Sequence, residues 1–307
     1  MNPVQQTIGS PVTVSGTGLH TGVETSITFH PAPENSGIRF IRSDLPGAPE
    51  IVADIDRVTD ISRGTVLSAN GVLVHTVEHV LAAVAGLEID NIQVELTNKE
   101  PPALDGSARG FVEALVKGRI LPQRVPRQIL EVEEPVRYSE KGSGTSIEVI
   151  PSQDFRVTCT LQYEHAVPGY QRMTLKSLND FAQQIAPART YCFLSELEDL
   201  KQKGLAKGGN LDNALVIADR ELGDREVRRL KSLFKTDREL FIGSNGILQG
   251  IPLRFENEPV RHKVLDIIGD LALLGQPLKG HVIATRSGHS SHVELVRRIR
   301  RVTLSHA

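Results

Sequence analysis

The sequence has 307 residues, of which 39% are hydrophobic and 23% charged, and its formal net charge is −2. These values exclude a disordered or fibrous chain, and they give no global positive field that would favour nucleic acid. The length suits one large domain or two of roughly 100–150 residues. We therefore expect a folded monomer of two domains with no nucleic-acid partner.

The cysteines and the first residues indicate where the protein works. Cys159 and Cys192 are too few for a disulfide framework, which fits a reducing compartment. Residues 1–6 show no basic segment followed by an apolar stretch, so no signal peptide is predicted. No run approaches the roughly 18–20 apolar residues of a membrane span. We expect a cytoplasmic protein.

The first half begins with a predicted hairpin, in which strand-like residues 11–14 and 24–29 flank a glycine-rich turn. That turn is not a dinucleotide loop, because Thr21 stands where the third glycine should be and no helix follows. A strand at 37–41 comes next.

An apolar helix is predicted at 76–86, with Thr76 able to cap its start and Gly86 its end. A strand at 91–96 and a second helix at 107–117 complete the first half.

The second half repeats this order of elements. Residues 135–138 and 145–151 echo 11–14 and 25–31, residues 155–161 echo 38–41, and the helix 261–269 with the strand 280–284 echoes the helix 76–86 and its following strand. Two related α+β halves pack most simply as a sheet-helix-helix-sheet sandwich, which buries the apolar helix faces between the sheets. We place the first half at 1–124 and the second at 125–307.

Two pieces have no counterpart in the repeat. Residues 187–219 look like a short helix and strand around a glycine-rich stretch, and residues 220–238 are charge-dense and predicted helical. Segments added to a repeated scaffold often shape a binding site, although the second piece has an equal claim to be surface padding.

A metal site is the main chemical hypothesis. His79 and His262 fall at matching places near two helix starts, so facing helices would bring them together. Asp266 lies four residues after His262 and shares its helical face. Two imidazoles and one carboxylate form a known catalytic zinc set that leaves one position open. Glu78, beside a ligand, is placed to accept a proton from water.

Each of these residues also has an ordinary explanation. A single histidine near a helix start is usually a satisfied polar residue, and Glu78 in a first turn complements the helix dipole. Asp266 by itself could equally be a solvent-exposed carboxylate on a helix. The pairing of two histidines through the repeat favours the metal site. The spacing of these residues in the sequence gives no further support for either explanation. Iron(II) also suits such a donor set.

A further histidine lies near the carboxyl end of the strand 280–284. His289, if protonated, would stabilise an oxyanion or protonate a leaving amine. Asp270, four residues beyond Asp266, would keep that imidazole charged. Ser-Gly-His is also a common loop composition, so this evidence is weak by itself.

Several segments together resemble the UDP-3-O-acyl-N-acetylglucosamine deacetylase family of lipid A biosynthesis. They are Gly18 to Gly22, Thr76 to His79, Ile89 to Ile92, Leu104 to Ser107, Ala188 to Thr190, Gly208-Gly209, Val260 to Asp266 and Ser287 to His289. The resemblance covers almost the whole chain. It implies two α+β halves with zinc between them and hydrolysis of the 2-acetamido group of a UDP-linked 3-O-acyl glucosamine.

The resemblance also implies roles for individual residues. His79, His262 and Asp266 match the metal ligands, Glu78 the base, His289 the charged histidine, Asp270 the carboxylate that orients it, Thr190 an oxyanion donor, and Lys263 a further active-site position. Whether Glu78 or His289 protonates the departing amine is left open.

Substrate contacts follow from the same resemblance. The insertion after Pro187 implies an apolar passage for the acyl chain, with Tyr191, Cys192, Phe193 and Leu205 as candidates, and Arg286 as a partner of the diphosphate. Tyr191 stands where the family usually has phenylalanine. The stretch 220–250 is longer than the usual link, and we have no functional account of it. The basic stretch 296–302 favours a solvated helix end over weak contact with an anionic membrane.

Two rival functions remain at this point. One is an inactive homologue that only binds a nucleotide sugar or an acyl carrier. The other is a zinc amidohydrolase that acts on a different acetamido sugar.

Overall fold

The computed structural model of the protein describes residues 3–165, 167–234 and 236–306. Two five-stranded sheets form its framework. The first sheet has the order β2 (Val12–Thr17), β3 (Glu24–Pro31), β9 (Ile92–Leu96), β4 (Ile38–Arg42) and β5 (Glu50–Val52). The second has the order β12 (Val136–Ser139), β13 (Ser146–Ile150), β19 (His281–Thr285), β14 (Arg156–Gln162) and β15 (Tyr170–Leu175). Strands β3, β9, β13 and β19 alternate between buried and more exposed residues, as the period of two predicts, whereas β14 is buried throughout its centre.

The two sheets have the same connectivity. In the first, only β4 and β9 run parallel, and their counterparts β14 and β19 are the parallel pair of the second. The neighbouring pairs are antiparallel in both sheets. The α+β fold of two related halves, predicted from the repeat, is therefore confirmed.

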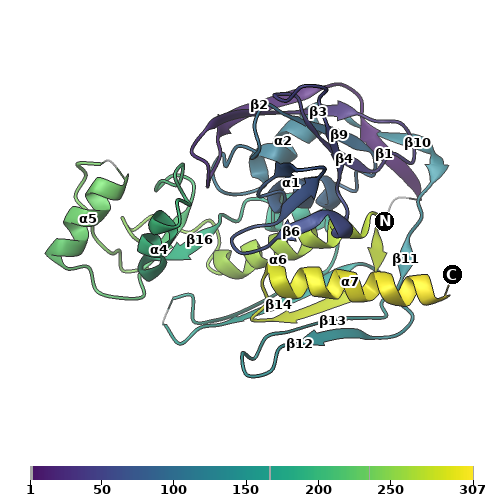
Figure 1. Cartoon of the computed structure of the whole chain (residues 1–307). Coiled ribbons are helices and arrows are strands. Elements are labelled where there is room, and N and C mark those ends of the chain that lie inside the picture. The colour runs from purple at the N-terminus through teal and green to yellow at the C-terminus, as the bar shows by residue number, and fades with distance from the viewer. Residues whose placement is uncertain (1–2, 166, 235, 307) are drawn as a thin grey trace.

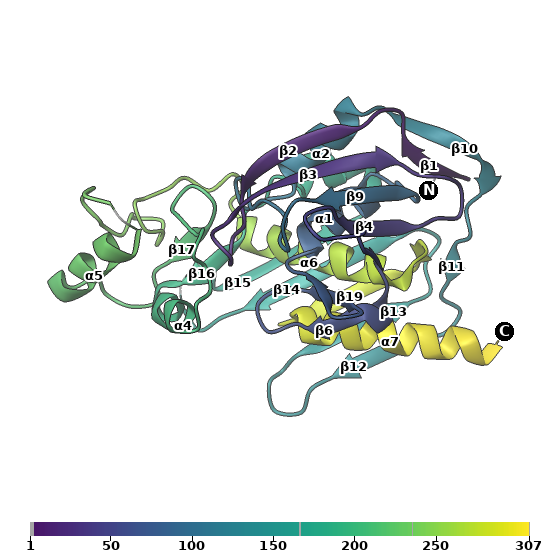
Figure 2. The ribbon, with the colours of Figure 1, turned by 45° about the horizontal axis from the view of Figure 1, so that its top comes forward.

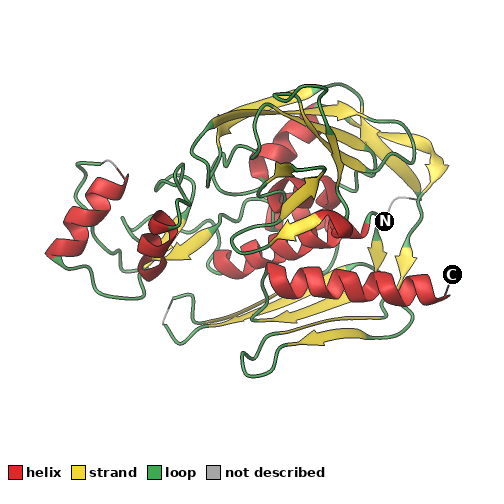
Figure 3. Cartoon of the chain, viewed as in Figure 1, coloured by secondary structure: helices red, strands yellow, loops and turns green. Residues whose placement is uncertain are grey.

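Helices lie between the two sheets, as Figures 1 and 3 show. Among them are α1 (Glu78–Gly86), α2 (Arg109–Lys117), α6 (Glu258–Leu271) and α7 (His289–His306). α2 packs on the first sheet and α7 on the second, while α1 and α6 pack directly against each other. The apolar residues of both halves join in one continuous core. The result is the predicted sheet-helix-helix-sheet sandwich.

α1 and α6 approach closely because a glycine lies at their contact. A β-carbon built on Gly269 of α6 would lie 2.1 Å from the carbonyl oxygen of Glu78, so only glycine fits there. α1 is consequently buried on nearly every side rather than on one face. Thr76 does not cap it as predicted, because Thr76 has a φ of +52° and donates its hydroxyl to Glu100.

Further short strand pairs lie outside the five-stranded sheets. β1 (Val4–Ile8) pairs with β10 (Ile120–Pro126), and β11 (Leu130–Glu131) pairs with β18 (Leu278–Lys279). β10 ends at Pro126 and β11 begins at Leu130. The boundary between the halves at 124 stays a prediction.

A three-stranded sheet between 58 and 74 was not predicted. It consists of β6 (Val58–Asp60), β7 (Val66–Ala69) and β8 (Val72–Val74). Asn70 and Gly71 turn β7 into β8 with φ angles of +50° and +80°. Asn-Gly between apolar runs is the strongest short-range hairpin signal, so the sequence did carry this information.

The insertion projects from one end of the sandwich, at the left of Figures 1 and 2. After the short helix α3 (Phe181–Gln184), it forms β16 (Tyr191–Phe193), α4 (Leu197–Gln202) and the parallel strand β17 (Leu215–Ile217), followed by the predicted helix, α5 (Asp224–Phe234).

Both ends of the insertion meet at one buried carboxylate in the first turn of α6. Glu258 accepts hydrogen bonds from the backbone and guanidinium of Arg189, and from the backbone N–H of Arg254. Arg254 also donates to the carbonyl of Pro187. The segment therefore leaves the scaffold and returns to it at the same place.

The C-terminal helix is docked onto the protein. Val296 and Ile299 are buried, and Arg300 forms an ion pair with Asp54 of the first half. Within the described residues, no helix combines the length and the apolar character needed to cross a membrane.

Candidate metal centre and active site

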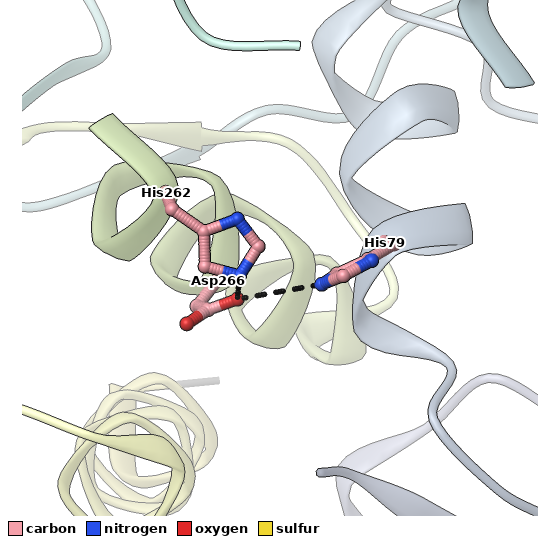
Figure 4. Close-up of side chains that lie close together, drawn as sticks. All are labelled: His79, His262 and Asp266. Atoms are coloured by element: carbon pink, nitrogen blue, oxygen red, sulfur yellow. Dashed lines mark ion pairs between the residues drawn. The ribbon is translucent and has the colours of Figure 1, made fainter. Parts of the chain in front are cut away.

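Three buried donor side chains converge where α1 meets α6. The Nε2 atoms of His79 and His262 lie 3.9 and 3.5 Å from Oδ1 of Asp266. All three donor atoms lie within 4.8 Å of one another. Figure 4 shows His262 and Asp266 on one helix pointing toward His79 on the other. The structure thus brings together the two histidines that the repeat paired and Asp266, which was placed by its helical spacing from His262.

Neighbouring groups leave the right atoms available for an ion. Nδ1 of His262 lies 3.0 Å from the carbonyl oxygen of Ala188, which fixes that nitrogen as the donor and frees Nε2. Nζ of Lys263 donates to Oδ2 of Asp266 at 3.0 Å and leaves Oδ1 facing the imidazoles. Such second partners commonly orient metal ligands.

The protonation states fit a divalent cation. Burial lowers the pKa of His79 to about 3 and also lowers that of His262, so both imidazoles are neutral at pH 7. Burial opposes ionisation of Asp266, but the adjacent Lys263 ammonium holds its pKa well below the usual range. Two neutral imidazoles and one carboxylate match the donor set of catalytic zinc sites.

Glu78 lies next to this group in a desolvated position. Burial raises its pKa to about 7, which suits a base that works near neutral pH. Its Oε2 accepts a hydrogen bond of 2.9 Å from the backbone N–H of Thr65. A β-carbon on Gly64 would lie 2.8 Å from Oε1, so the glycine makes room for the carboxylate.

His289, at the start of α7, forms a charged pair with Asp270. Nδ1 of His289 lies 2.7 Å from Oδ2 of Asp270. Burial disfavours the imidazolium, but the carboxylate overcomes this and raises the pKa of His289 to about 10. The pKa of Asp270, which burial alone would raise, is lowered to about 2 by the same partner and by His292. The imidazolium is therefore the form present at neutral pH.

Thr65 connects the two catalytic candidates and was missed from the sequence. Its hydroxyl donates to Oδ1 of Asp270 at 2.6 Å, while its backbone N–H holds Glu78. Thr65 is completely buried and precedes β7, so the unpredicted sheet supplies this link between the halves. No local pattern marks Thr65, because Asp270 is 205 positions away.

A cavity of about 270 Å³ opens beside the donor group. Its walls include Thr190, Lys263, Tyr191, Cys192 and Leu205 among the predicted site residues, together with His79, His262, Asp266, Glu78 and His289. Phe193 and Arg286 do not line it. Phe193 packs against Tyr163, and the Arg286 side chain lies beside Gly144.

The glycine-rich turn of the first hairpin is a docking point for the insertion. Glu100, almost fully buried, accepts hydrogen bonds from the backbone of His20 and Thr21 and anchors the turn. A β-carbon on Gly208 would lie 2.2 Å from the carbonyl oxygen of Gly18, so the two glycine-rich stretches touch through their backbones. The close backbone contact with Gly208 therefore accounts for the glycines of this turn, and no bound phosphate is needed to explain them.

Comparison with known proteins agrees with this geometry. The model of the family described as UDP-3-O-acyl N-acetylglycosamine deacetylase (LpxC) matches residues 5–234 and 233–301. The chain belongs to this family. The resemblance inferred from the sequence motifs is thereby confirmed, and the LpxC matches span both halves and the insertion.

Some curated relatives are named as the deacetylase, and others as a bifunctional enzyme LpxC/FabZ. A bifunctional enzyme LpxC/FabZ from Chlorobaculum tepidum is 44% identical over 299 residues, which cover 97% of this chain and 64% of that protein. A UDP-3-O-acyl-N-acetylglucosamine deacetylase from Myxococcus xanthus is 38% identical over 96% of this chain and 86% of its own length. One from Thermosynechococcus vestitus is 37% identical over 96% of this chain and 93% of its own length. The chain thus spans under two thirds of the bifunctional relative and most of the deacetylases.

Proposed function

We propose that the protein hydrolyses the acetamido group of UDP-3-O-acyl-N-acetylglucosamine, a step of lipid A biosynthesis, with zinc held by His79, His262 and Asp266. The observation that carries this proposal is the convergence of the three donors, Glu78 and the His289 cation on one cavity. The names of the LpxC relatives support the substrate class.

In this mechanism a bound zinc ion supplies Lewis acidity, which polarises an amide carbonyl and makes water a better nucleophile. Glu78 takes the proton of the attacking water. Its Oε2 already accepts from Thr65, so Oε1 is the atom available for that proton. The pKa of about 7 keeps much of Glu78 ionised at neutral pH and allows the proton to be passed on.

His289 and Thr190 complete the proposed catalytic group. The His289 imidazolium stabilises the negative charge that develops on the carbonyl oxygen, and the Thr190 hydroxyl adds a neutral donor from the same cavity. Asp270 keeps His289 charged. Lys263 holds Asp266 and lies over the Tyr191 ring, with Nζ 5.5 Å from the ring centroid. Either Glu78 or His289 protonates the departing amine.

The acyl chain is proposed to enter the insertion along Tyr191, Cys192 and Leu205. The Tyr191 hydroxyl lies 3.3 Å from that of Tyr163. This partner allows a tyrosine where the family usually has phenylalanine. Phe193 packs edge-to-face on Tyr191 of this wall, with ring centroids 6.3 Å apart. Arg286 is proposed to meet the diphosphate outside the cavity. Because one chain supplies every group, we propose that the enzyme acts as a monomer, in the cytoplasm.

The deciding experiment measures acetate release from UDP-3-O-acyl-N-acetylglucosamine before and after chelation. We expect activity to disappear with the metal and to return with Zn²⁺, with anaerobic Fe²⁺ as the alternative ion. Activity that survives complete metal removal would refute the metal site. Equal turnover of unacylated UDP-N-acetylglucosamine would favour a different acetamido sugar, and no turnover by the zinc-loaded protein would favour an inactive homologue.

Glu78→Gln tests the base separately from the metal. The variant keeps the shape of the side chain but cannot accept a proton, so we expect kcat to fall by about 10²–10⁴-fold. Metal analysis of the same preparation should show the wild-type zinc content. Undiminished turnover would remove Glu78 from the mechanism.

A further inference from the structure

Helix α5 (Asp224–Phe234) lies within the stretch 220–250, to which we could assign no function from the sequence. Its apolar residues Val227, Leu230, Leu233 and Phe234 recur at helical spacing, and the residues between them are mainly charged. Leu230 is buried, whereas Arg228 and Arg229 are exposed. An amphipathic helix of this kind has one face that needs a partner.

The rest of the insertion provides that partner. Leu230 belongs to an apolar cluster with Leu194 and Leu197 around α4, and Val227, Leu233 and Phe234 pack against the same cluster. Arg229 of α5 forms an ion pair with Glu198 of α4. α5 is therefore attached to the β16-α4-β17 unit rather than padding the surface.

The last turn of α5 also lines the active-site cavity. Leu233 and Phe234 share that cavity with His79 and Asp266, and further apolar residues of the unit line it: Leu197, Leu200, Ala214 and Val216. In Figures 1 and 2, α5 lies beyond α4 and β16 on the side away from α6. An apolar chain that starts at the metal and follows this wall reaches α5 last.

We propose that α5 forms the outer wall of the acyl passage and that Leu233 and Phe234 set the length of acyl chain that fits best. This inference rests on the proposed function, because it concerns the substrate of the same cavity. A chain that stops short of these side chains loses apolar contact, and one that reaches past them clashes or leaves the cavity. Each methylene buried or lost changes affinity by about fourfold.

The experiment compares UDP-N-acetylglucosamine donors that differ only in the length of the 3-O-acyl chain. Phe234→Ala removes the ring from the wall and should move the optimum of kcat/KM to chains about two methylenes or more longer. Phe234→Trp should move it to shorter chains. Val227→Ala is the matched control, since Val227 lies on the same face of α5 but does not line the cavity. Its profile should stay that of the wild type.

A second readout is independent of deacetylation. Calorimetric binding of free saturated fatty acids of increasing length to the zinc-loaded proteins should show the same shifts for Phe234→Ala and Phe234→Trp. Unchanged length profiles in both readouts would overturn the inference, as would an equal shift in Val227→Ala. If the wild type binds fatty acids with the expected length dependence but deacetylates no donor, the proposed function fails and the passage stands.

Discussion

At the scale of single residues, the site gives two buried carboxylic acids very different pKa values. Glu78 and Asp270 are both buried carboxylic acids, yet the pKa of the first is raised to about 7 and that of the second is lowered to about 2. The difference arises because Asp270 contacts two histidines and a hydroxyl, whereas Glu78 accepts from a neutral backbone N–H. In the proposed mechanism, this difference in pKa suits Glu78 to proton transfer and Asp270 to holding the His289 cation.

Thr65→Val tests the link between these two groups. The change removes the hydroxyl donor to Asp270 and keeps the volume and the backbone contact with Glu78. We expect kcat to fall by about 10–100-fold with normal zinc content, as is usual for groups that orient a catalytic partner. Thr65→Ser should restore most of the rate in steady-state assays. Equal loss in both variants would indicate a packing role only.

Asp270→Asn tests the charge on His289 through the pH profile. The pKa of His289, about 10, lies above its ordinary value because of Asp270, so the imidazolium persists through neutral pH and is lost as pH rises through that value. Without the carboxylate this loss occurs at lower pH. We expect the alkaline limb of kcat/KM to move to lower pH in the variant. If the alkaline limb of the kcat/KM profile does not move, the charge on His289 has no role in the reaction.

At the scale of elements, the site depends on the close packing of α1 against α6. Gly269→Ala places a methyl group against the backbone of Glu78 and pushes the helices apart. We expect the free energy of unfolding to fall by about 1–3 kcal/mol, and zinc affinity to fall because His79 moves relative to Asp266. Denaturant unfolding and metal titration measure both effects.

Gly223→Ala is the control for this change, because a β-carbon at Gly223 meets nothing within 4 Å. Stability and zinc affinity should then match the wild type. A stable Gly269→Ala protein with normal zinc binding would show that the helices can separate without disturbing the donors.

The sequence contained the repeated elements but not all of the contacts between them. The repeat predicted both sheets, the facing helices and the convergence of His79 with His262, because apolar periodicity and residue type are local properties. The sheet at 58–74 was missed despite its Asn70-Gly71 turn, since its strands are only three or four residues long. The Glu258 contacts with Arg189 and Arg254 depend on how distant segments meet, which no window of sequence shows.

At the scale of the whole molecule, the donor group joins the two halves. His79 comes from α1 of the first half, while His262 and Asp266 come from α6 of the second. A metal bound there stabilises only the folded protein, by about 2.7 kcal/mol when the free ion is at 100 times its dissociation constant. We expect a chelator to lower the melting temperature of the wild type, as measured by calorimetry. His79→Ala should show little change, and an equal response in both proteins would place the stabilising ion elsewhere.

The meeting of both ends of the insertion at Glu258 has a consequence for how the molecule can be altered. A segment whose ends are held together can be replaced without stretching the sheets or helices from which it departs. We therefore expect the stretch from Tyr191 to Leu253 to be exchangeable as one unit, provided that the backbone contact of Gly208 with Gly18 is kept. We expect that transplanting it into another family member, with Arg189, Arg254 and Glu258 retained, transfers the preference for a length of 3-O-acyl chain. The host should keep its own hydrolytic chemistry.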